Sequence, residues 1–278
     1  MKYKLVCIDL DGTLLNSKRR ISEASKKILK KAEELGIYIV ITTGRTFLDA
    51  KDYSNLIGLN SPIIACTGAI VKEKHEPDVI YKSTIEEELS RKLLIILKKY
   101  NAKPIFNSLS KTYCGNLIVA TIMRYLKFKG YVNRSVKIEF VKNSERWDEV
   151  FHSEKNNIVK CEIISRSRNK INSLRKELLN MNSIEITSSS NHNIEITTKG
   201  TSKGNAIKIL ADHYKIKKEE IIAIGDSEND LSAIEFAGMG IAMGNASDAV
   251  KEISNFITDT NDNDGVAKAI EKFIFSKY

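Results

Sequence analysis

The sequence has few of the residues that mark disordered, disulfide-bonded or membrane-spanning chains. Proline is scarce, at 3 of 278 residues, and the charged and hydrophobic shares of 28% and 42% are typical of packed globular proteins. Cys7, Cys66, Cys114 and Cys161 lie far apart with no CxxC motif, so we expect reduced core thiols. The first apolar run meets Asp9 too early for a signal peptide or a membrane span. We therefore expect a cytoplasmic protein.

Several motifs of nucleotide-dependent and metal-dependent enzymes are also missing. Gly238, Gly240 and Gly244 do not fit the GxGxxG pattern of dinucleotide-binding folds, and no GxxxxGK[ST] loop occurs. The four histidines, at positions 75, 152, 192 and 213, have neither metal-ligand nor triad spacing. We interpret them as surface or loop residues.

Positive charge is abundant, with a net charge of +9, and it is concentrated in the middle of the chain. Residues 84–192 contain 20 basic and 11 acidic side chains, whereas the remainder contains 24 of each. A basic segment that binds nucleic acid also needs aromatic side chains between its charges, and only residues 124–131 have them. We expect Tyr125 and Phe128 to pack against a helix end instead. The sequence thus argues against nucleic acid as a partner.

Alternating strand and helix patterns at both ends of the chain predict an α/β fold with a Rossmann-like doubly wound parallel sheet. Strands are expected at residues 4–10, 37–42, 62–66, 221–225 and 240–243. Helices are expected before Gly36, at residues 46–57, 202–213, 228–237 and 246–253, and from residue 265 onward.

The alternation is interrupted between these two parts. Helices are expected there at residues 86–99 and 168–180, and strands at 136–141, 157–165, 184–187 and 193–197. We predict an inserted α+β cap domain over residues 84–192, within a catalytic core formed by residues 1–83 and 193–278. Both chain ends then belong to one domain.

Acid-rich or glycine-rich turns follow three predicted strands, at residues 9–13, 42–45 and 225–230. In a parallel sheet they lie at the carboxyl edge, where such folds bind ligands. Gly12 allows a turn through which Asp9 and Asp11 can face one ligand. With Asp226 they form an oxygen site suited to Mg²⁺. Alone, an Asp-x-Asp-Gly turn is equally typical of a strand end and a helix cap, so its meaning depends on its neighbours.

Lys203 stands at the start of a predicted helix, where the helix dipole disfavours a cation. By itself it would be interpreted as a solvated lysine. Beside a phosphate at the carboxyl edge it is a natural counter-charge for phosphoryl oxygens.

These segments resemble the four motifs of haloacid dehalogenase-like phosphatases, in particular the Cof-type branch with an inserted cap. The motifs are Asp9-Leu10-Asp11-Gly12-Thr13, Thr43 with Gly44-Arg45, Lys203 with Gly204, and Gly225-Asp226-Ser227-Glu228-Asn229-Asp230. One position departs from the pattern, because Thr67 stands where this branch commonly has asparagine. A substrate contact or the hinging of the cap could differ there.

The resemblance implies a Mg²⁺-dependent phosphatase that acts on a small phosphorylated metabolite through an aspartyl-phosphate. Asp9 is then the nucleophile and a metal ligand. Asp11 is general acid and then base, and its backbone carbonyl also binds the metal. Asp226 completes the protein ligands, and Asp230 supports them from outside the coordination shell. The groups implied to hold the phosphoryl oxygens are the Leu10 and Gly44 amides, Thr43, Lys203 and Asn229.

Two alternatives stay open at this point. A phosphomutase would use the same intermediate and return the phosphoryl group to its substrate. A non-enzymatic anion or nucleic-acid binder would make the core a vestigial scaffold, which the complete set of catalytic residues argues against. Neither the natural substrate nor the oligomeric state follows from the sequence.

Overall fold

The computed structural model describes residues 2–276 and divides into two compact units. The first consists of the described parts of Met1–Arg45, Ala50–Tyr81 and Ser202–Tyr278, and the second of Thr46–Asp49 and Lys82–Thr201. The described residues near both ends of the chain therefore fall in the first unit. The second unit extends beyond the expected boundary at residue 193, because β11 (Asn193–Thr198) pairs with the strands on both of its sides there.

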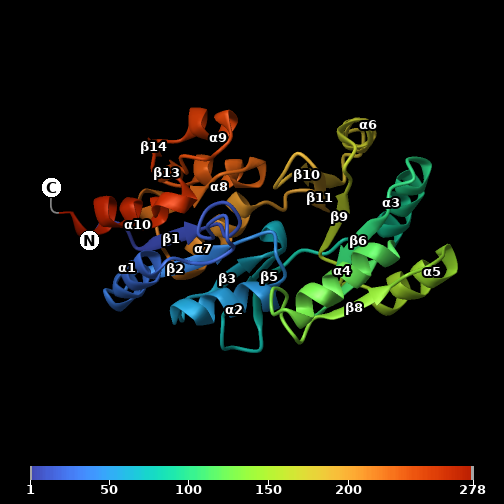
Figure 1. Ribbon diagram of the computed structural model, residues 1–278, viewed down its shortest axis with the longest axis horizontal. Helices are drawn as coiled ribbons and strands as arrows, with labels where there is room; N and C mark the ends of the chain where they lie inside the picture. Colours follow the sequence, from blue (N-terminus) through green and yellow to red (C-terminus); the bar gives the residue numbers. More distant parts are fainter. Residues whose placement is uncertain (1, 277–278) are drawn as a thin grey trace. The chain divides into compact units, whose positions relative to one another are not determined.

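The first unit is built on an eight-stranded sheet of order β14-β13-β12-β1-β2-β3-β4-β5 (Figure 1). Neighbouring strands from β14 to β3 are parallel, and β4 runs antiparallel to β3. The parallel α/β core predicted from the sequence is therefore present, whereas β4, β5 and β14 were not predicted. The strands are β1 (Leu5–Ile8), β2 (Tyr38–Thr42), β3 (Ile63–Ala65), β4 (Ile70–Lys72), β5 (Val79–Lys82), β12 (Ile221–Gly225), β13 (Met239–Ala242) and β14 (Phe256–Ile257).

Helices cover this sheet because its strands are apolar along their whole length. Leu5 and Cys7 of β1 pack with Ile207 and Leu210 of α7 in one buried cluster, while Val6 and its alternate neighbours point to the opposite face and are also buried. The α-helices of this unit are α1 (Glu23–Glu34), α2 (Phe47–Ile57, which belongs to this unit from Ala50 onward), α7 (Lys203–Tyr214), α8 (Leu231–Phe236), α9 (Asp248–Ile253) and α10 (Gly265–Ile270). Shorter turns are η1 (Cys66–Gly68), η2 (Lys218–Glu220), η3 (Glu228–Asp230), η4 (Asn261–Asn263) and η5 (Glu271–Phe275).

The second unit contains a six-stranded sheet of order β10-β11-β9-β6-β7-β8. Helices α3, α5 and α6 pack on the face that carries Phe106 and Tyr113, and α4 packs on the face that carries Ile105 and Cys114. The sequence analysis missed β6, β7, α4 and α5. Besides β11, the elements are α3 (Glu87–Lys99), β6 (Pro104–Asn107), β7 (Lys111–Cys114), α4 (Leu117–Phe128), β8 (Lys137–Phe140), α5 (Ser144–Ser153), β9 (Lys160–Ile164), α6 (Arg168–Leu178) and β10 (Ile184–Thr187).

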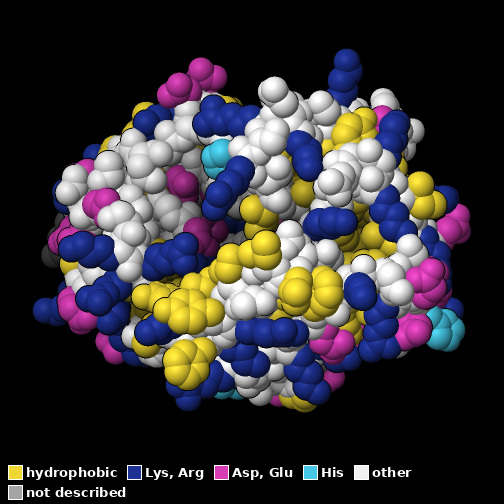
Figure 2. Space-filling view, turned by 45° about the vertical axis from the view of Figure 1, so that its right-hand side comes forward, with side chains coloured by type: hydrophobic (Ala, Val, Ile, Leu, Met, Phe, Trp, Pro, Cys, Tyr) yellow, Lys and Arg dark blue, Asp and Glu magenta, His cyan; other side chains and the backbone are white. Residues whose placement is uncertain are grey.

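The surface and the thiols test several smaller expectations. All four cysteines are free and buried, and all four histidines are exposed, as predicted. The expectation that Tyr125 and Phe128 pack against a helix end is wrong, because they are 57% and 78% exposed on the outer side of α4. Lysine and arginine side chains are spread over the visible face of the molecule instead of forming one patch (Figure 2). Between residues 2 and 276, none of the helices combines the length and the apolar character needed to cross a membrane.

Candidate active site

The carboxyl edge of the parallel sheet brings the predicted turns together. Because β1 lies between β12 and β2, with Ile8 in register with both neighbours, the residues that follow these strands emerge side by side. Asp9 follows β1, Thr43 follows β2 and Asp226 follows β12. The structure therefore places three of the expected site residues at one edge of the sheet.

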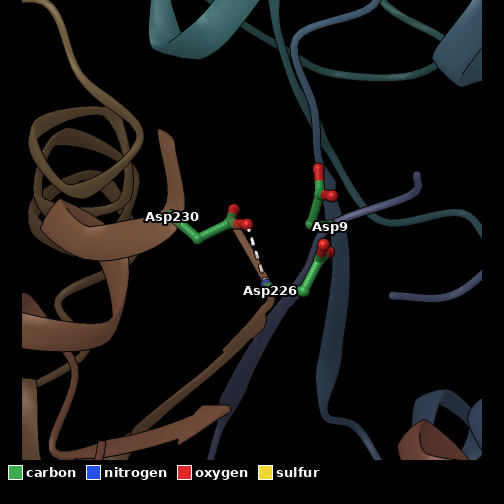
Figure 3. Close-up of side chains that lie close together, drawn as sticks. All are labelled: Asp9, Asp226 and Asp230. Carbon is green, nitrogen blue, oxygen red and sulfur yellow. Dashed lines mark hydrogen bonds between the residues drawn. The ribbon is translucent and has the colours of Figure 1, made fainter. Parts of the chain in front are cut away.

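Three carboxylates gather at this edge. Asp9, Asp226 and Asp230 offer oxygen atoms that all lie within 4.8 Å of one another (Figure 3). Asp9 comes from the end of β1, whereas the other two come from the turn between β12 and α8. Carboxylate oxygens at such spacing are ligands that Mg²⁺ prefers, and the negative charge that they concentrate fits a divalent cation.

Lys203, the first residue of α7, is the cation that lies among these carboxylates. Its side chain is fully buried, and its Nζ donates hydrogen bonds to Oδ1 of Asp9 and Oδ1 of Asp230, both at 2.6 Å. Burial alone would lower the pKa of this ammonium, but the charges of Asp230 and Asp9 outweigh it and raise the pKa. Lys203 is therefore a permanent positive charge at the place where the sequence predicted one.

One ammonium does not neutralise three carboxylates, of which Asp9 and Asp230 are buried and Asp226 is partly buried. Burial and the neighbouring charges of Asp230 and Asp226 raise the pKa of Asp9 well above its usual range, although Lys203 opposes this. Burial and the charge of Asp230 raise the pKa of Asp226 to about 7. The site therefore favours any ligand that brings positive charge close to Asp9 and Asp226.

Asp230 is already held by the protein. Its Oδ2 accepts a hydrogen bond from the backbone N–H of Asp226 at 3.0 Å (Figure 3). The same oxygen accepts from the Ser227 N–H at 3.1 Å, while Oδ1 accepts the hydrogen bond from Lys203. This carboxylate therefore orients Lys203 and the turn that carries Asp226. Its contacts fit a supporting position better than that of a direct metal ligand.

The first turn depends on Gly12 and on two residues that the sequence analysis gave no role. Gly12 has a φ of +82°, and a Cβ atom at this position would lie 2.5 Å from Oδ2 of Asp226, so only glycine fits here. The Thr13 hydroxyl donates to Oδ1 of Asp226 at 2.6 Å, and the Asn245 side-chain amide donates to the Gly12 carbonyl at 2.8 Å. Thr13 lies in the first motif segment of the sequence, which was the available signal for it.

Asp11 lies apart from the carboxylate cluster. Its side chain is about half exposed and forms a two-point ion pair with Arg45, from Nε to Oδ2 and from Nη2 to Oδ1, both at 2.6 Å. Partial burial would raise its pKa, but the hydrogen bonds and charge of Arg45 lower it. The sequence analysis quoted Arg45 in a motif without assigning it this contact.

The remaining predicted phosphate-binding residues lie in neighbouring turns. Thr43 is buried, and its Oγ1 accepts a hydrogen bond from the Arg45 N–H at 3.2 Å. Asn229 is also buried and accepts a hydrogen bond from the Ser227 hydroxyl at 3.3 Å. Within residues 2–276, no hydrogen bond links Thr43 or Asn229 to Asp9. Leu10 and Gly44 occupy the first and second turns as the motif order requires.

Thr67 follows β3 in a left-handed backbone conformation, with φ 60° and ψ 31°. Its N–H donates to the Thr43 carbonyl at 3.0 Å, so this turn supports the turn that follows β2. Asparagine adopts the left-handed conformation far more readily than a β-branched residue does. The geometry explains why asparagine suits this position and shows that threonine is strained there.

Comparison with known proteins places the chain in a family. The haloacid dehalogenase-like hydrolase family model matches residues 6–270. The chain is 30% identical to the 5-amino-6-(5-phospho-D-ribitylamino)uracil phosphatase YcsE of Bacillus subtilis, with 98% of this chain and 96% of that protein covered. It is 32% identical to the putative phosphatase YxeH of the same organism, with 99% and 100% covered. A solved structure of a subclass IIB sugar phosphatase of the superfamily has a TM-score of 0.81 and 25% identity, with 97% and 98% covered.

The chain therefore belongs to the haloacid dehalogenase-like hydrolases. The family and the α/β fold class predicted from the sequence are confirmed.

Proposed function

We propose that the protein is a Mg²⁺-dependent phosphatase that hydrolyses a small phosphorylated metabolite through an aspartyl-phosphate on Asp9. The phosphatase class itself follows from the family and its named relatives. The observation that carries the finer proposal is the buried cluster in which Lys203 bridges Asp9 and Asp230 beside Asp226. This cluster provides a nucleophile, a fixed counter-charge and a place for a divalent cation at one sheet edge.

Asp9 and Asp226 would hold Mg²⁺ with their carboxylates, together with the backbone carbonyl of Asp11. The bound ion supplies positive charge that offsets repulsion between the attacking carboxylate and a phosphate dianion. Lys203 supplies further positive charge to the phosphoryl oxygens from its fixed position. Thr43, Asn229 and the amides of Leu10 and Gly44 would complete the binding of those oxygens, as the resemblance implies.

The reaction then has two displacement steps. In the first, the Asp9 carboxylate oxygen attacks phosphorus, the bond to the ester oxygen breaks, and protonated Asp11 gives its proton to the leaving oxygen. In the second, water attacks phosphorus, Asp11 takes the proton from water, and the bond to Asp9 breaks. Free phosphate, the alcohol and the original carboxylate and carboxylic acid result, so protons balance over the cycle.

A sugar phosphate or a similar phosphomonoester is the proposed substrate class, supported by the sugar phosphatase among the structural neighbours and by the phosphorylated ribityl substrate named for the Bacillus subtilis relative. No membrane or nucleic-acid partner is part of this proposal. The chemistry at Asp9 would be the same for any phosphomonoester, so other contacts must select the substrate.

The test is a screen of phosphorylated metabolites and p-nitrophenyl phosphate, with release of inorganic phosphate as the readout. We expect hydrolysis with Mg²⁺, loss of activity after chelation and recovery when Mg²⁺ is added back. Activity that survives thorough chelation would contradict the metal role. Isomerisation of a sugar phosphate without phosphate release would favour the phosphomutase alternative.

A further inference from the structure

The Arg45 guanidinium holds both carboxylate oxygens of Asp11, and this pairing has consequences for the choice of substrate. The two hydrogen bonds, at 2.6 Å each, leave neither oxygen of Asp11 without a strong donor. In the proposed reaction Asp11 must reach the ester oxygen of the substrate. A carboxylate held at two points by a guanidinium is not placed to do so, and Arg45 must first move to another acceptor.

Arg45 is held so that such an exchange needs only a movement of its head group. Its N–H donates to Thr43 Oγ1 at 3.2 Å, and its carbonyl accepts from the Cys66 N–H at 2.8 Å, so both sides of its backbone are fixed. The guanidinium carbon lies 5.0 Å from the centre of the Tyr53 ring, and Nη1 donates to the Tyr53 hydroxyl at 3.3 Å. The ring therefore supports the positive charge on one side of the head group.

We propose that Arg45 is a specificity residue that exchanges Asp11 for an oxygen acceptor of the leaving group, located on the carbon next to the phosphorylated carbon. This inference rests on the proposed phosphatase function. An acceptor at that position lies three bonds from the carbon-bound ester oxygen, which is the atom that Asp11 must protonate. One movement of the guanidinium would then bind the substrate and free the Asp11 carboxylate, which takes up a proton from solvent before it protonates the ester oxygen.

The strength of the contact between Arg45 and the leaving group should determine which substrates are preferred. A carboxylate can replace Asp11 at both hydrogen bonds and carries the same charge, so it should compete best. A neighbouring hydroxyl, as in polyol and sugar phosphates, offers one neutral acceptor and should compete less well. An alkyl group offers none, and Arg45 should then stay with Asp11.

Three phosphate esters of nearly equal size test this order, namely 2-phosphoglycolate, 2-hydroxyethyl phosphate and ethyl phosphate. For the wild type with Mg²⁺ we expect kcat/KM to fall along this series, by about 10-fold or more from the first to the last because a charge-assisted pair is lost. In Arg45→Ala the series should flatten to within about threefold, and Arg45→Lys should keep part of the slope because lysine retains charge without the fork. Thermal unfolding checks that each variant is folded.

The matched control removes a surface ion pair of similar length at the opposite end of β1. Lys4 Nζ lies 2.6 Å from Glu220, and Lys4→Gln should leave the slope of the series unchanged. A flat series in the wild type, or a slope that persists in Arg45→Ala, would overturn the assignment of Arg45 while phosphate release still supports the phosphatase. No turnover of these esters or of p-nitrophenyl phosphate would instead remove the proposed function and this inference with it.

Discussion

Each unit of the molecule contains a lysine that is buried between two carboxylates. Lys203 in the first unit lies 2.6 Å from each of its two partners, whereas Lys160 in the second unit lies 3.5 Å and 3.7 Å from its partners. Both are ion pairs removed from water, which are costly unless every polar group is satisfied. The two clusters differ in the number of hydrogen-bond donors to their carboxylates. We use this difference to distinguish a structural cluster from a reactive one.

The cluster around Lys160 has hydrogen-bond donors for its carboxylates. Asn193 donates from Nδ2 to Oε1 of Glu162 at 3.1 Å and to Oε1 of Glu195 at 3.3 Å. The Ser189 hydroxyl donates to the same Glu195 oxygen at 2.8 Å. Hydrogen bonds from neutral amide and hydroxyl groups therefore stabilise the carboxylates on strands β9 and β11.

The cluster around Lys203 leaves two of its carboxylates with few donors. Within residues 2–276, the side chain of Asp9 accepts a hydrogen bond only from Lys203, and that of Asp226 only from Thr13. Asp230 is the exception, with three donors. Unfavourable charge is therefore concentrated on the two residues proposed to meet metal and phosphate, which is a common cost of a functional site.

Among the variants that test the difference between the Lys203 and Lys160 clusters, Asp9→Asn should have the largest effect on activity. We expect kcat to fall by about 1,000-fold or more, because an amide is not a nucleophile for phosphoryl transfer. The thermal midpoint without metal should stay the same or rise, since a crowded buried charge is removed. Steady-state rates with p-nitrophenyl phosphate and thermal unfolding measure both. Residual activity above a few per cent would contradict the role of Asp9.

Lys203→Met should affect both activity and stability. We expect kcat to fall by about 100-fold or more with the loss of a fixed charge at the phosphoryl group. Unfolding free energy should fall by roughly 3–5 kcal/mol, because Asp9 and Asp230 remain buried without their partner. Denaturant unfolding and phosphatase assays measure the two losses. Loss of stability with near-normal kcat would make Lys203 a structural residue only.

Lys160→Met is the matched control for that variant in the second unit. It should also cost stability, by about 3 kcal/mol, because Glu162 and Glu195 lose a buried partner. The rate with p-nitrophenyl phosphate should stay within about threefold of the wild type, since this cluster has no proposed part in the chemistry. A loss of kcat as large as that of Lys203→Met would end the distinction between the two clusters.

Thr67→Asn tests whether backbone strain, like charge, is concentrated near the proposed site. Asparagine should raise the unfolding free energy by about 1 kcal/mol, because it adopts the left-handed conformation at lower cost than a β-branched residue. Thr67→Val keeps the branched shape without the hydroxyl and should not stabilise the protein. Denaturant midpoints decide between them, and a decrease in Thr67→Asn would show that the threonine side chain is needed here.

The residues of the Lys203 cluster could be predicted from the sequence because each follows a strand or begins a helix with a clear pattern. Parallel strands have one carboxyl edge, so Asp9, Thr43 and Asp226 had to meet there. Asp230 accepts more hydrogen bonds than Asp226 does, and this difference depends on the turn geometry at Gly12 and Ser227. The types of the residues alone do not reveal that geometry. The pairing of Asp11 with Arg45 was hidden for the same reason.

The second unit was harder to predict because its elements carry weaker patterns. Strands β6 and β7 have four residues each and are separated by a tight turn, so neither shows a full alternation. Helix α4 has apolar residues on its exposed side as well as on its buried side, with Ile118, Ile122 and Phe128 all exposed. Periodicity cannot identify a helix whose outer face is also apolar.

The smallest expected effect concerns the excess positive charge of residues 84–192. Exposed basic side chains are screened by water and salt, unlike the buried Lys160 and Lys203. Lys127 is engaged in structure, since its Nζ donates to the Val136 carbonyl at 2.6 Å, whereas Lys129 and Arg134 are exposed. If such residues attract an anionic substrate, raising salt from 10 mM to 150 mM should raise KM about two- to threefold with kcat unchanged, because the Debye length falls from about 30 Å to about 8 Å.

Neutralising Lys129 and Arg134 together, as Lys129→Gln and Arg134→Gln, should raise KM for 2-phosphoglycolate at low salt by a similar factor. The control is Lys92→Gln with Lys99→Gln, which removes the same charge from α3, where both side chains are more than half exposed. Equal effects of the two double variants would mean that net charge attracts the substrate and that position is unimportant. If KM changes with neither salt nor substitution, the basic residues only solvate the surface, as their spread over the visible face suggests (Figure 2).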